Sequence, residues 1–171
     1  MKLNLKELVL FALISAMMIT SKLIMEVLPN IHLIGVFIIA TTVVYRQKAL
    51  YPISAYIFLQ GLISGFDLWW APYLYIWTVL WGLTMLLPQK MPKALAPVVY
   101  CALCGFHGLI FGILYAPAQA LMFGLNFSGM VSWIIAGFPF DITHAIGNTV
   151  CGILIVPIIT VLKSASKYAK N

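Results

Sequence analysis

The sequence has little charge. Only 8% of its 171 residues are Asp, Glu, Lys or Arg, whereas 63% are hydrophobic, and the mean hydropathy is +1.04. A soluble domain of this size would cover its core with far more charge, so the composition excludes an ordinary soluble globular protein. It indicates an integral membrane protein, and the chain is long enough for about six spans of roughly 20 residues each.

Motifs of several enzyme classes are also missing. The chain has no GxxxxGK[ST] loop to bind phosphates, no HExxH and no GxSxG. Its three cysteines do not form a disulfide framework, and Cys101 and Cys104 lie as a CxxC within an apolar segment where thiols usually serve as packing residues. No basic cluster interleaved with aromatic residues is present, which argues against nucleic acid as a partner.

Prolines and charged residues divide the apolar sequence into segments. We expect a single all-α domain over residues 1–171, a bundle of six transmembrane helices in which the first apolar run is a retained helix and not a signal peptide. The expected spans are approximately residues 5–28, 31–45, 49–64, 73–87, 97–115 and 139–162.

The positions of the basic residues predict an orientation. With six spans, nine cations fall on one side of the membrane: Lys2, Lys6, Arg46, Lys48, Lys90, Lys93, Lys163, Lys167 and Lys170. Cytoplasmic loops carry the excess of Lys and Arg, so both termini are predicted to be cytoplasmic. A seventh span through 116–137 would place the C-terminal lysines outside. We therefore expect that region to be a long, apolar, partly helical outer loop, lying in the interface or folded back as a lid.

The outward ends of the expected spans hold most of the unusual polar chemistry. Ionisable residues within spans normally face a bundle interior or a wet cavity, so we expect these side chains to line an outward-facing pocket. The predicted binding residues are Glu26, Asn30, His32, Asp67, Trp69, Trp70, Tyr73, Gln119, Asn126, Asp141, His144 and Asn148.

The stretch FPFDITHAIGN at 138–148 is the most informative part of this set. Pro139 suits the first turn of a helix, and offsets of three and seven residues place Asp141, His144 and Asn148 on one helical face. Two interpretations remain open. Asp141 caps the helix while the other two residues hold neighbouring helices together, or all three line a ligand cavity.

Other parts of the predicted pocket also have two interpretations. Lys22 and Glu26 are one turn apart and either pair with each other or contact a ligand. The run DLWWAPYLYIW (67–77) fits an aromatic belt at the membrane interface, and it also fits stacking on a planar organic molecule. His107 lies in the middle of a span, where helix packing accounts for it better than ligation.

Small residues at a spacing of four suggest close helix contacts. Ala12 and Ala16 lie one turn apart in the first span, and Gly108 and Gly112 share this spacing in a segment where internal packing accounts for it.

The chain resembles the substrate-binding S components of energy-coupling factor (ECF) vitamin transporters. The resemblance rests on the chain length, the six expected spans, the Ala-x-x-x-Ala pair and the segments LPNIHLIGVFI, DLWWAPYLYIWTVLWG and FPFDITHAIGN. This likeness runs nearly from end to end.

The resemblance implies a function and partners. It implies a vitamin-binding subunit in a bacterial cell membrane, which docks through Ala12 and Ala16 on a transmembrane coupling subunit. Two cytoplasmic ATPases would use ATP and Mg, and this chain would have neither a cofactor of its own nor enzyme activity. Among S components the likeness is to cobalamin-type members, while folate, a flavin, pantothenate or a queuosine precursor are alternative substrates. The alternative from another class is an intramembrane enzyme that uses Asp141 and His144.

Overall fold

The protein is built entirely of helices. The computed structural model describes residues 3–170, and no strand occurs within them, which confirms the predicted all-α class. The α-helices are α1 (Leu5–Ile24), α2 (Ile34–Tyr45), α3 (Leu50–Ser64), α4 (Tyr73–Leu86), α5 (Leu95–Leu109), α6 (Phe111–Phe123), α7 (Phe127–Cys151) and α8 (Ile155–Lys170). Short 3₁₀ turns adjoin them at η1 (Met25–Val27), η2 (Arg46–Ala49), η3 (Leu68–Trp70) and η4 (Gly152–Leu154).

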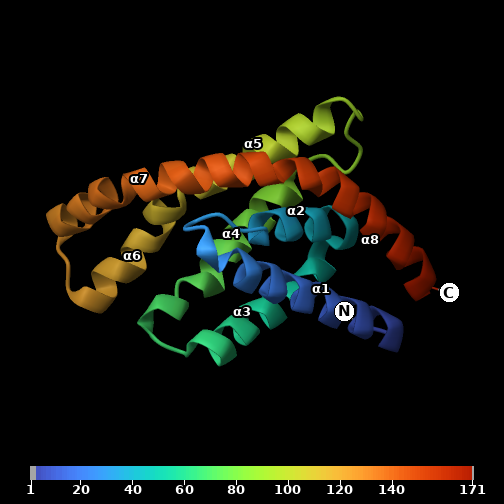
Figure 1. The fold of residues 1–171 in the computed structure, drawn as a ribbon, viewed down its shortest axis with the longest axis horizontal. Helices are drawn as coiled ribbons and strands as arrows, with labels where there is room; N and C mark the ends of the chain where they lie inside the picture. The colour runs from blue at the N-terminus through green and yellow to red at the C-terminus, as the bar shows by residue number, and fades with distance from the viewer. Residues whose placement is uncertain (1–2, 171) are drawn as a thin grey trace.

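Helix α2 lies at the centre of the bundle. Every residue from Ile34 to Thr42 is buried, and α2 packs against α1, α4, α5 and α8. Figure 1 shows α5 and α7 side by side along one edge, while α6 and the first turns of α7 extend away from the two termini. Because α2 is surrounded by protein, it can be apolar all round without facing lipid.

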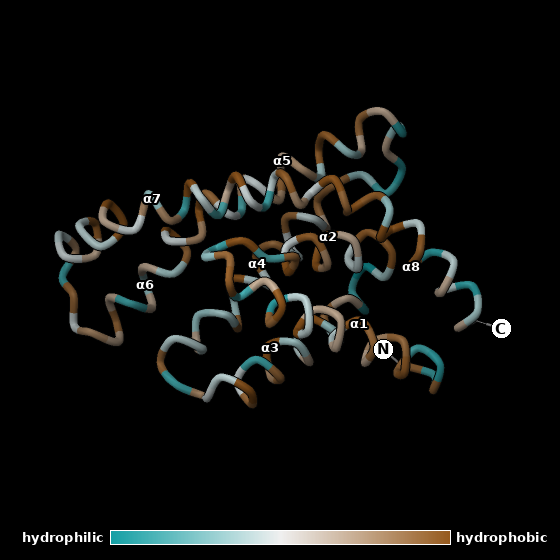
Figure 2. Tube along the Cα trace, in the orientation of Figure 1, coloured by the Kyte–Doolittle hydropathy of each residue, from teal (hydrophilic) through white to brown (hydrophobic). Residues whose placement is uncertain are grey.

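Within residues 3–170, three helical segments are long and apolar enough to cross a membrane. They are Leu5–Val27, Leu95–Phe123 and Phe127–Ala169. The helices α2, α3 and α4 have 12, 15 and 14 residues, which is shorter than the roughly 20 residues that cross a hydrocarbon core alone. In Figure 2, hydrophobic residues dominate most of the chain, as expected of a membrane-associated protein.

The expectation of a long outer loop over 116–137 is wrong. Only residues 124–126 lie outside helices there, with Gly124 at φ 65° ending α6 and Asn126 capping α7 through its side chain. Pro139 therefore does not begin a helix but sits inside α7, which continues through it. Helices that cross membranes tolerate an internal proline because neighbouring groups compensate for the missing bond.

Glycines bring α5 and α7 into close contact. A Cβ atom at Gly108 would lie 2.9 Å from both the carbonyl carbon and the oxygen of His144, and one at Gly105 would lie 3.3 Å from the Ala145 oxygen. Only glycine fits at such a separation between helix backbones. This contact confirms that the Gly108 spacing serves internal packing, and it fixes the side of α7 that faces α5.

The end of the bundle that holds both termini, here called the lysine end, is tied together by polar contacts. Glu7 and Asn4 form a capping box at the start of α1, and Asn4 Nδ2 donates to the Ala169 oxygen at 3.0 Å. The Glu7 carboxylate lies 2.6 Å from Lys48 Nζ. Lys2 and the side chain of Lys170, which belong to the predicted cationic side, lie outside the described residues.

Candidate functional site

All three histidines of the chain meet at one place, although they are 112 residues apart in sequence at their widest (144 − 32). The rings of His32 and His144 have centroids 4.8 Å apart. Trp77 contacts two of the three histidines, with its ring centroid 5.8 Å from that of His32 and 5.6 Å from that of His107. This histidine cluster (His32, His107 and His144 with Trp77 and, one turn further along α7, Asn148) joins α4, α5, α7 and the segment before α2.

The histidine cluster contains buried polar atoms without partners. Seven buried side-chain nitrogen or oxygen atoms of the described residues make no hydrogen bond, and five of them belong to the cluster: His32 Nδ1, Trp77 Nε1, His107 Nδ1, His144 Nε2 and Asn148 Oδ1. An unpaired buried polar group costs about 1–3 kcal/mol. Such a concentration at one place marks a site where further hydrogen bonds can be made.

Two adjoining cavities open beside the cluster. One, of about 210 Å³, runs from Lys22 and Glu26 to Tyr73 and His32. The other, of about 240 Å³, lies between Asp141 and the aromatic residues of α6 and α7. Both cavities are lined by Asn30, Phe111 and His144, so these three side chains form the partition between them.

The turn before α2 positions two of the lining residues. Asn30 has φ 60°, in the left-handed region that Asn tolerates better than most residues, and the Ile31 N–H donates to the Leu28 oxygen at 3.1 Å. This turn brings Asn30 to the partition and His32 to the ring of His144. The short sequence LPNIH therefore serves as a wall of the site as well as a connection between helices.

The face of α7 predicted from sequence does point to one place. Asp141 Oδ1 accepts from the Gly112 N–H at 3.0 Å, and Asn148 Nδ2 donates to the Cys104 oxygen at 3.3 Å. Asp141 does not cap its own helix, because α7 begins fourteen residues before it (141 − 127); it accepts from the first turn of α6 instead. Both interpretations of this face thus hold in part: Asp141 and Asn148 tie helices together, while Asp141 and His144 also line a cavity.

Aromatic side chains form a continuous row through the site. Phe111 is central, with ring centroids 5.7 Å from Trp77, 6.3 Å from Tyr73 and 4.9 Å from His144. Tyr115 extends the row by stacking on Trp133 at 5.8 Å. Rings arranged in this way can pack against both faces of a planar ligand.

The predicted residues divide into two groups. Six of them line the two cavities: Glu26, Asn30, His32, Tyr73, Asp141 and His144. The others lie elsewhere. Trp70 Nε1 donates to the Ile57 oxygen, Asp67 and Asn126 cap η3 and α7, Trp69 contributes its backbone oxygen to Tyr115, and Gln119 and Asn148 do not reach a cavity.

Several residues of the site were not among the predicted set. They are His107, Phe111, Tyr115, Trp77, Trp133 and Lys22. A signal for three of them was present, because His107, Phe111 and Tyr115 repeat every four residues and therefore share one helical face. Trp133 lies in the region expected to be an outer loop, from which Gln119 and Asn126 were predicted as binding residues but Trp133 was not.

Electrostatics at the mouth of the smaller cavity are mixed. Lys22 Nζ lies 3.4 Å from Glu26 Oε1, which confirms the pairing expected from their spacing while both still line the cavity. His32, in the connection between α1 and α2, is half-buried as a residue, but its Nδ1 is shielded from solvent. This desolvation lowers the pKa of His32 from 6.5 to about 4. His32 is therefore neutral near pH 7, and its ring presents one donor and one acceptor to its surroundings.

The histidine cluster is not arranged as a metal site. Within residues 3–169, no group of three His, Cys, Asp or Glu side chains has the geometry to hold a metal ion. The site is better suited to an organic ligand with polar edges and a flat face. No protein-family model, curated protein or solved structure matches the chain.

Proposed function

We propose that this chain is the substrate-binding S component of an ECF-type importer in a bacterial membrane. In this proposal six segments cross the membrane, including the shorter α2, α3 and α4, and the lysine end faces the cytoplasm in accord with the positive-inside rule. The histidine cluster then lies toward the outside, where a vitamin would enter. The observation that carries the proposal is that His32 and His144, whose Nδ1 and Nε2 are buried without partners, line two adjoining cavities.

The size of the cavities narrows the choice of substrate. Pockets for small organic ligands usually occupy about 300–1,000 Å³, and cavities of about 240 and 210 Å³ together fall at the lower end of that range. A corrinoid is larger than this space. Among the candidate vitamins, the site favours a flat heterocycle such as a flavin, a pteridine or a queuosine precursor over cobalamin.

The chemistry of the lining supports capture of a ligand over catalysis. Asp141, the strongest candidate for a general base, is engaged with the Gly112 N–H. His144 contributes an unpaired Nε2 at the partition, where it can donate to or accept from a heterocycle. The intramembrane-enzyme alternative predicts product formation by the purified protein, which ligand analysis would reveal.

Ligand identification by mass spectrometry tests the binding function. Protein purified in mild detergent from rich medium is expected to release a small heterocyclic vitamin on denaturation. Replacing His144 by Leu removes one hydrogen bond to the ligand and should weaken binding about tenfold to a hundredfold in titration, since such a bond to a buried group is worth about 1–3 kcal/mol. Thr143→Val, on the exposed side of the same helix, is the matched control and should bind normally.

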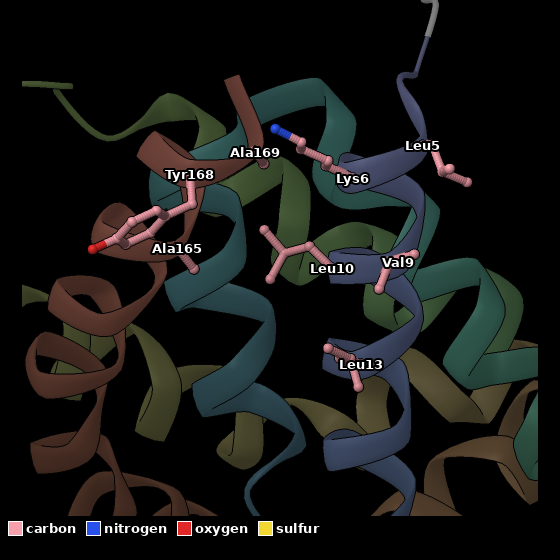
Figure 3. Close-up of a pocket in the computed structure, with 8 residues that line it drawn as sticks. All are labelled: Leu5, Lys6, Val9, Leu10, Leu13, Ala165, Tyr168 and Ala169. Atoms are coloured by element: carbon pink, nitrogen blue, oxygen red, sulfur yellow. The ribbon is translucent and has the colours of Figure 1, made fainter. Parts of the chain in front are cut away.

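The proposed partner surface is on α1. Ala12 and Ala16 are exposed, and they share a helical face with the exposed Leu5, Val9 and Leu13. Leu5, Val9 and Leu13 line a groove of about 550 Å³ between α1 and α8. Figure 3 shows these three side chains on α1 across from Ala165 and Tyr168 of α8. Small residues beside exposed leucines allow a helix of the coupling subunit to approach closely.

Bulky substitutions test the partner surface. Ala12→Trp or Ala16→Trp should reduce vitamin uptake to background in cells that supply the coupling subunit and ATPases, while the purified variants bind vitamin normally. Val98→Trp, at an exposed position on α5, is the control and should transport. Normal uptake by both alanine variants would show that the partner docks elsewhere.

A further inference from the structure

A second large cavity lies at the lysine end, far from the histidine cluster. It has a volume of about 540 Å³ and opens between α8, the first turns of α5 and the loop that joins α4 to α5, with α2 beneath it. Val43, Val156 and Ile159 form its apolar floor, and Lys93, Lys163 and Lys167 form its rim. Figure 1 shows that these elements meet at the same end of the bundle as the C-terminus.

The charge on this rim is not balanced by the protein. The chain has four acidic residues, and each is engaged elsewhere. Glu7 binds Lys48, Glu26 pairs with Lys22, Asp67 accepts from the Leu68 N–H, and Asp141 accepts from the Gly112 N–H. None of the four acidic side chains lines the cavity, so the three lysines leave it with an excess of positive charge that would attract an anion.

The geometry of α8 concentrates this charge. Lys163 and Lys167 are exposed and one turn apart, a spacing at which like charges repel and destabilise a helix unless a counter-ion lies near them. Ser164 also lines the cavity and adds a hydroxyl that can donate to an anion. Figure 2 shows hydrophilic residues along the last turns of α8 and in the loop between α4 and α5, next to hydrophobic turns of both α8 and α5.

The apolar floor distinguishes between kinds of anion. A free phosphate or a nucleotide would be held by the lysines but would leave Val43, Val156 and Ile159 without a partner. A phospholipid satisfies both parts, because its phosphate can lie among the lysines while an acyl chain covers the floor. Clusters of basic residues at the ends of membrane helices attract anionic lipids, at about 1 kcal/mol per Lys near the membrane surface.

We propose that the cavity between α5 and α8 binds one anionic phospholipid, with its phosphate between Lys93, Lys163 and Lys167 and an acyl chain along the floor. The bound lipid joins the loop after α4 to the last helix, which are otherwise separated by about 70 residues of chain (163 − 93). The site does not depend on the identity of the vitamin or on the ECF assignment, since it rests on the lysine end alone.

Native mass spectrometry of delipidated protein tests this proposal. With dioleoyl phosphatidylglycerol added at increasing concentration, the wild-type protein should retain one lipid molecule at low ratios, and it should retain dioleoyl phosphatidylcholine at least tenfold more weakly. The triple variant Lys93→Gln, Lys163→Gln, Lys167→Gln should lose at least tenfold in phosphatidylglycerol affinity. Lys90→Gln, which removes a lysine from the same loop but outside the cavity, should bind as wild type.

Two further measurements distinguish loss of the lipid site from a folding defect and from recognition of the phosphate alone. Arginine at positions 93, 163 and 167 keeps the charge and should restore lipid binding, which excludes a general folding defect in the glutamine variant. Glycerol 3-phosphate at millimolar concentration should not displace the lipid if the acyl chain contributes. Equal retention of the two lipids, an unaffected triple variant, or full displacement by glycerol 3-phosphate would each overturn the proposal.

Discussion

Buried polar atoms are treated differently at the two ends of the bundle. At the lysine end, half-buried polar groups have partners: Tyr45 Oη donates to the Leu162 oxygen at 3.1 Å, and Arg46 Nη2 donates to the Met85 oxygen at 2.6 Å. In the histidine cluster, five buried atoms have none within the described residues. Polar networks that are fully satisfied make a structure rigid, whereas unsatisfied ones lower stability until a ligand arrives. The hydrogen bonds of the lysine end stabilise the fold, whereas in the proposed function the unpaired atoms of the histidine cluster await a ligand.

The largest loss of stability is expected from a substitution at the α5–α7 backbone contact beside the histidine cluster. In Gly108→Val, the new Cβ would lie only 2.9 Å from the carbonyl group of His144. Because both contacting groups are backbone, the clash can be relieved only by separating α5 from α7. Overpacking at such a contact costs about 3 kcal/mol or more, so we expect loss of the monodisperse species in size-exclusion chromatography. Gly82→Ala is the control, because a Cβ there meets nothing within 4 Å. A well-folded Gly108→Val protein would contradict the close packing of α5 against α7.

Low pH should lower the free energy of unfolding through protonation of His32. The folded pKa of about 4 lies below the unfolded value of 6.5, so the unfolded chain takes up a proton first as the pH falls. Stability is therefore fully present above pH 6.5 and is lost between pH 6.5 and pH 4, by at most about 3 kcal/mol from this residue. His32→Phe should reduce the fall in melting temperature over this range. An identical pH profile in the variant would show that His32 protonates normally in the folded protein.

Breaking the ion pair at the lysine end should lower stability. Lys48→Met leaves the Glu7 carboxylate, which belongs to a residue 9% exposed, without the ammonium group that lies 2.6 Å away. Loss of a half-buried pair of this kind should lower the free energy of unfolding by about 1–2 kcal/mol, which lies between the values for exposed and buried pairs. Thermal unfolding in detergent measures the loss, and Lys22→Met, in a more exposed pair, should change it little. Equal losses of stability in the two variants would show that the Lys48–Glu7 pair contributes no more than the exposed Lys22–Glu26 pair.

The smallest predicted effect is a gain in stability, in the variant His32→Phe. His32→Phe keeps a ring against Trp77 and His144 but removes an unpaired nitrogen from the interior. The ligand-free protein should become more stable by about 1 kcal/mol at pH 7, because a buried polar atom without a partner is costly. The same substitution should weaken vitamin binding. Destabilisation of the ligand-free protein would indicate that His32 already has a structural partner.

The helical class and the polar face of α7 were accessible from sequence for a physical reason. Period and composition are local properties, and they placed Asp141, His144 and Asn148 correctly on one face. The convergence of His107 with His32 and His144 was not accessible, because it depends on glycine contacts between helices.

The expectation of a loop at 116–137 rested on the number of lysines on each side of the membrane, and Pro139 was expected in the first turn of the next helix. Proline ends helices in water, but within a bundle its missing bond is tolerated, and α7 begins twelve residues before it (139 − 127). The start of α7 was therefore assigned to a loop, and Trp133 was left out of the predicted binding residues although Gln119 and Asn126 of the same region were included. This assignment did not affect Glu26, Asn30 or Tyr73, which lie in segments where the predicted boundaries were close.

The glycines that α5 and α6 present to α7 have a consequence for how such a protein can diverge. Because Gly105 and Gly108 set the separation of the α5 and α7 backbones, the depth of the site is fixed by atoms that every residue possesses, while Gly112 makes room for the Asp141 carboxylate. Substitution there moves a whole helix, whereas substitution at the mouth, in residues 25–33 or 133–140, alters only side chains. Selection for a new ligand is expected to rewrite the mouth and to leave the glycines unchanged, so that one scaffold can give rise to many specificities.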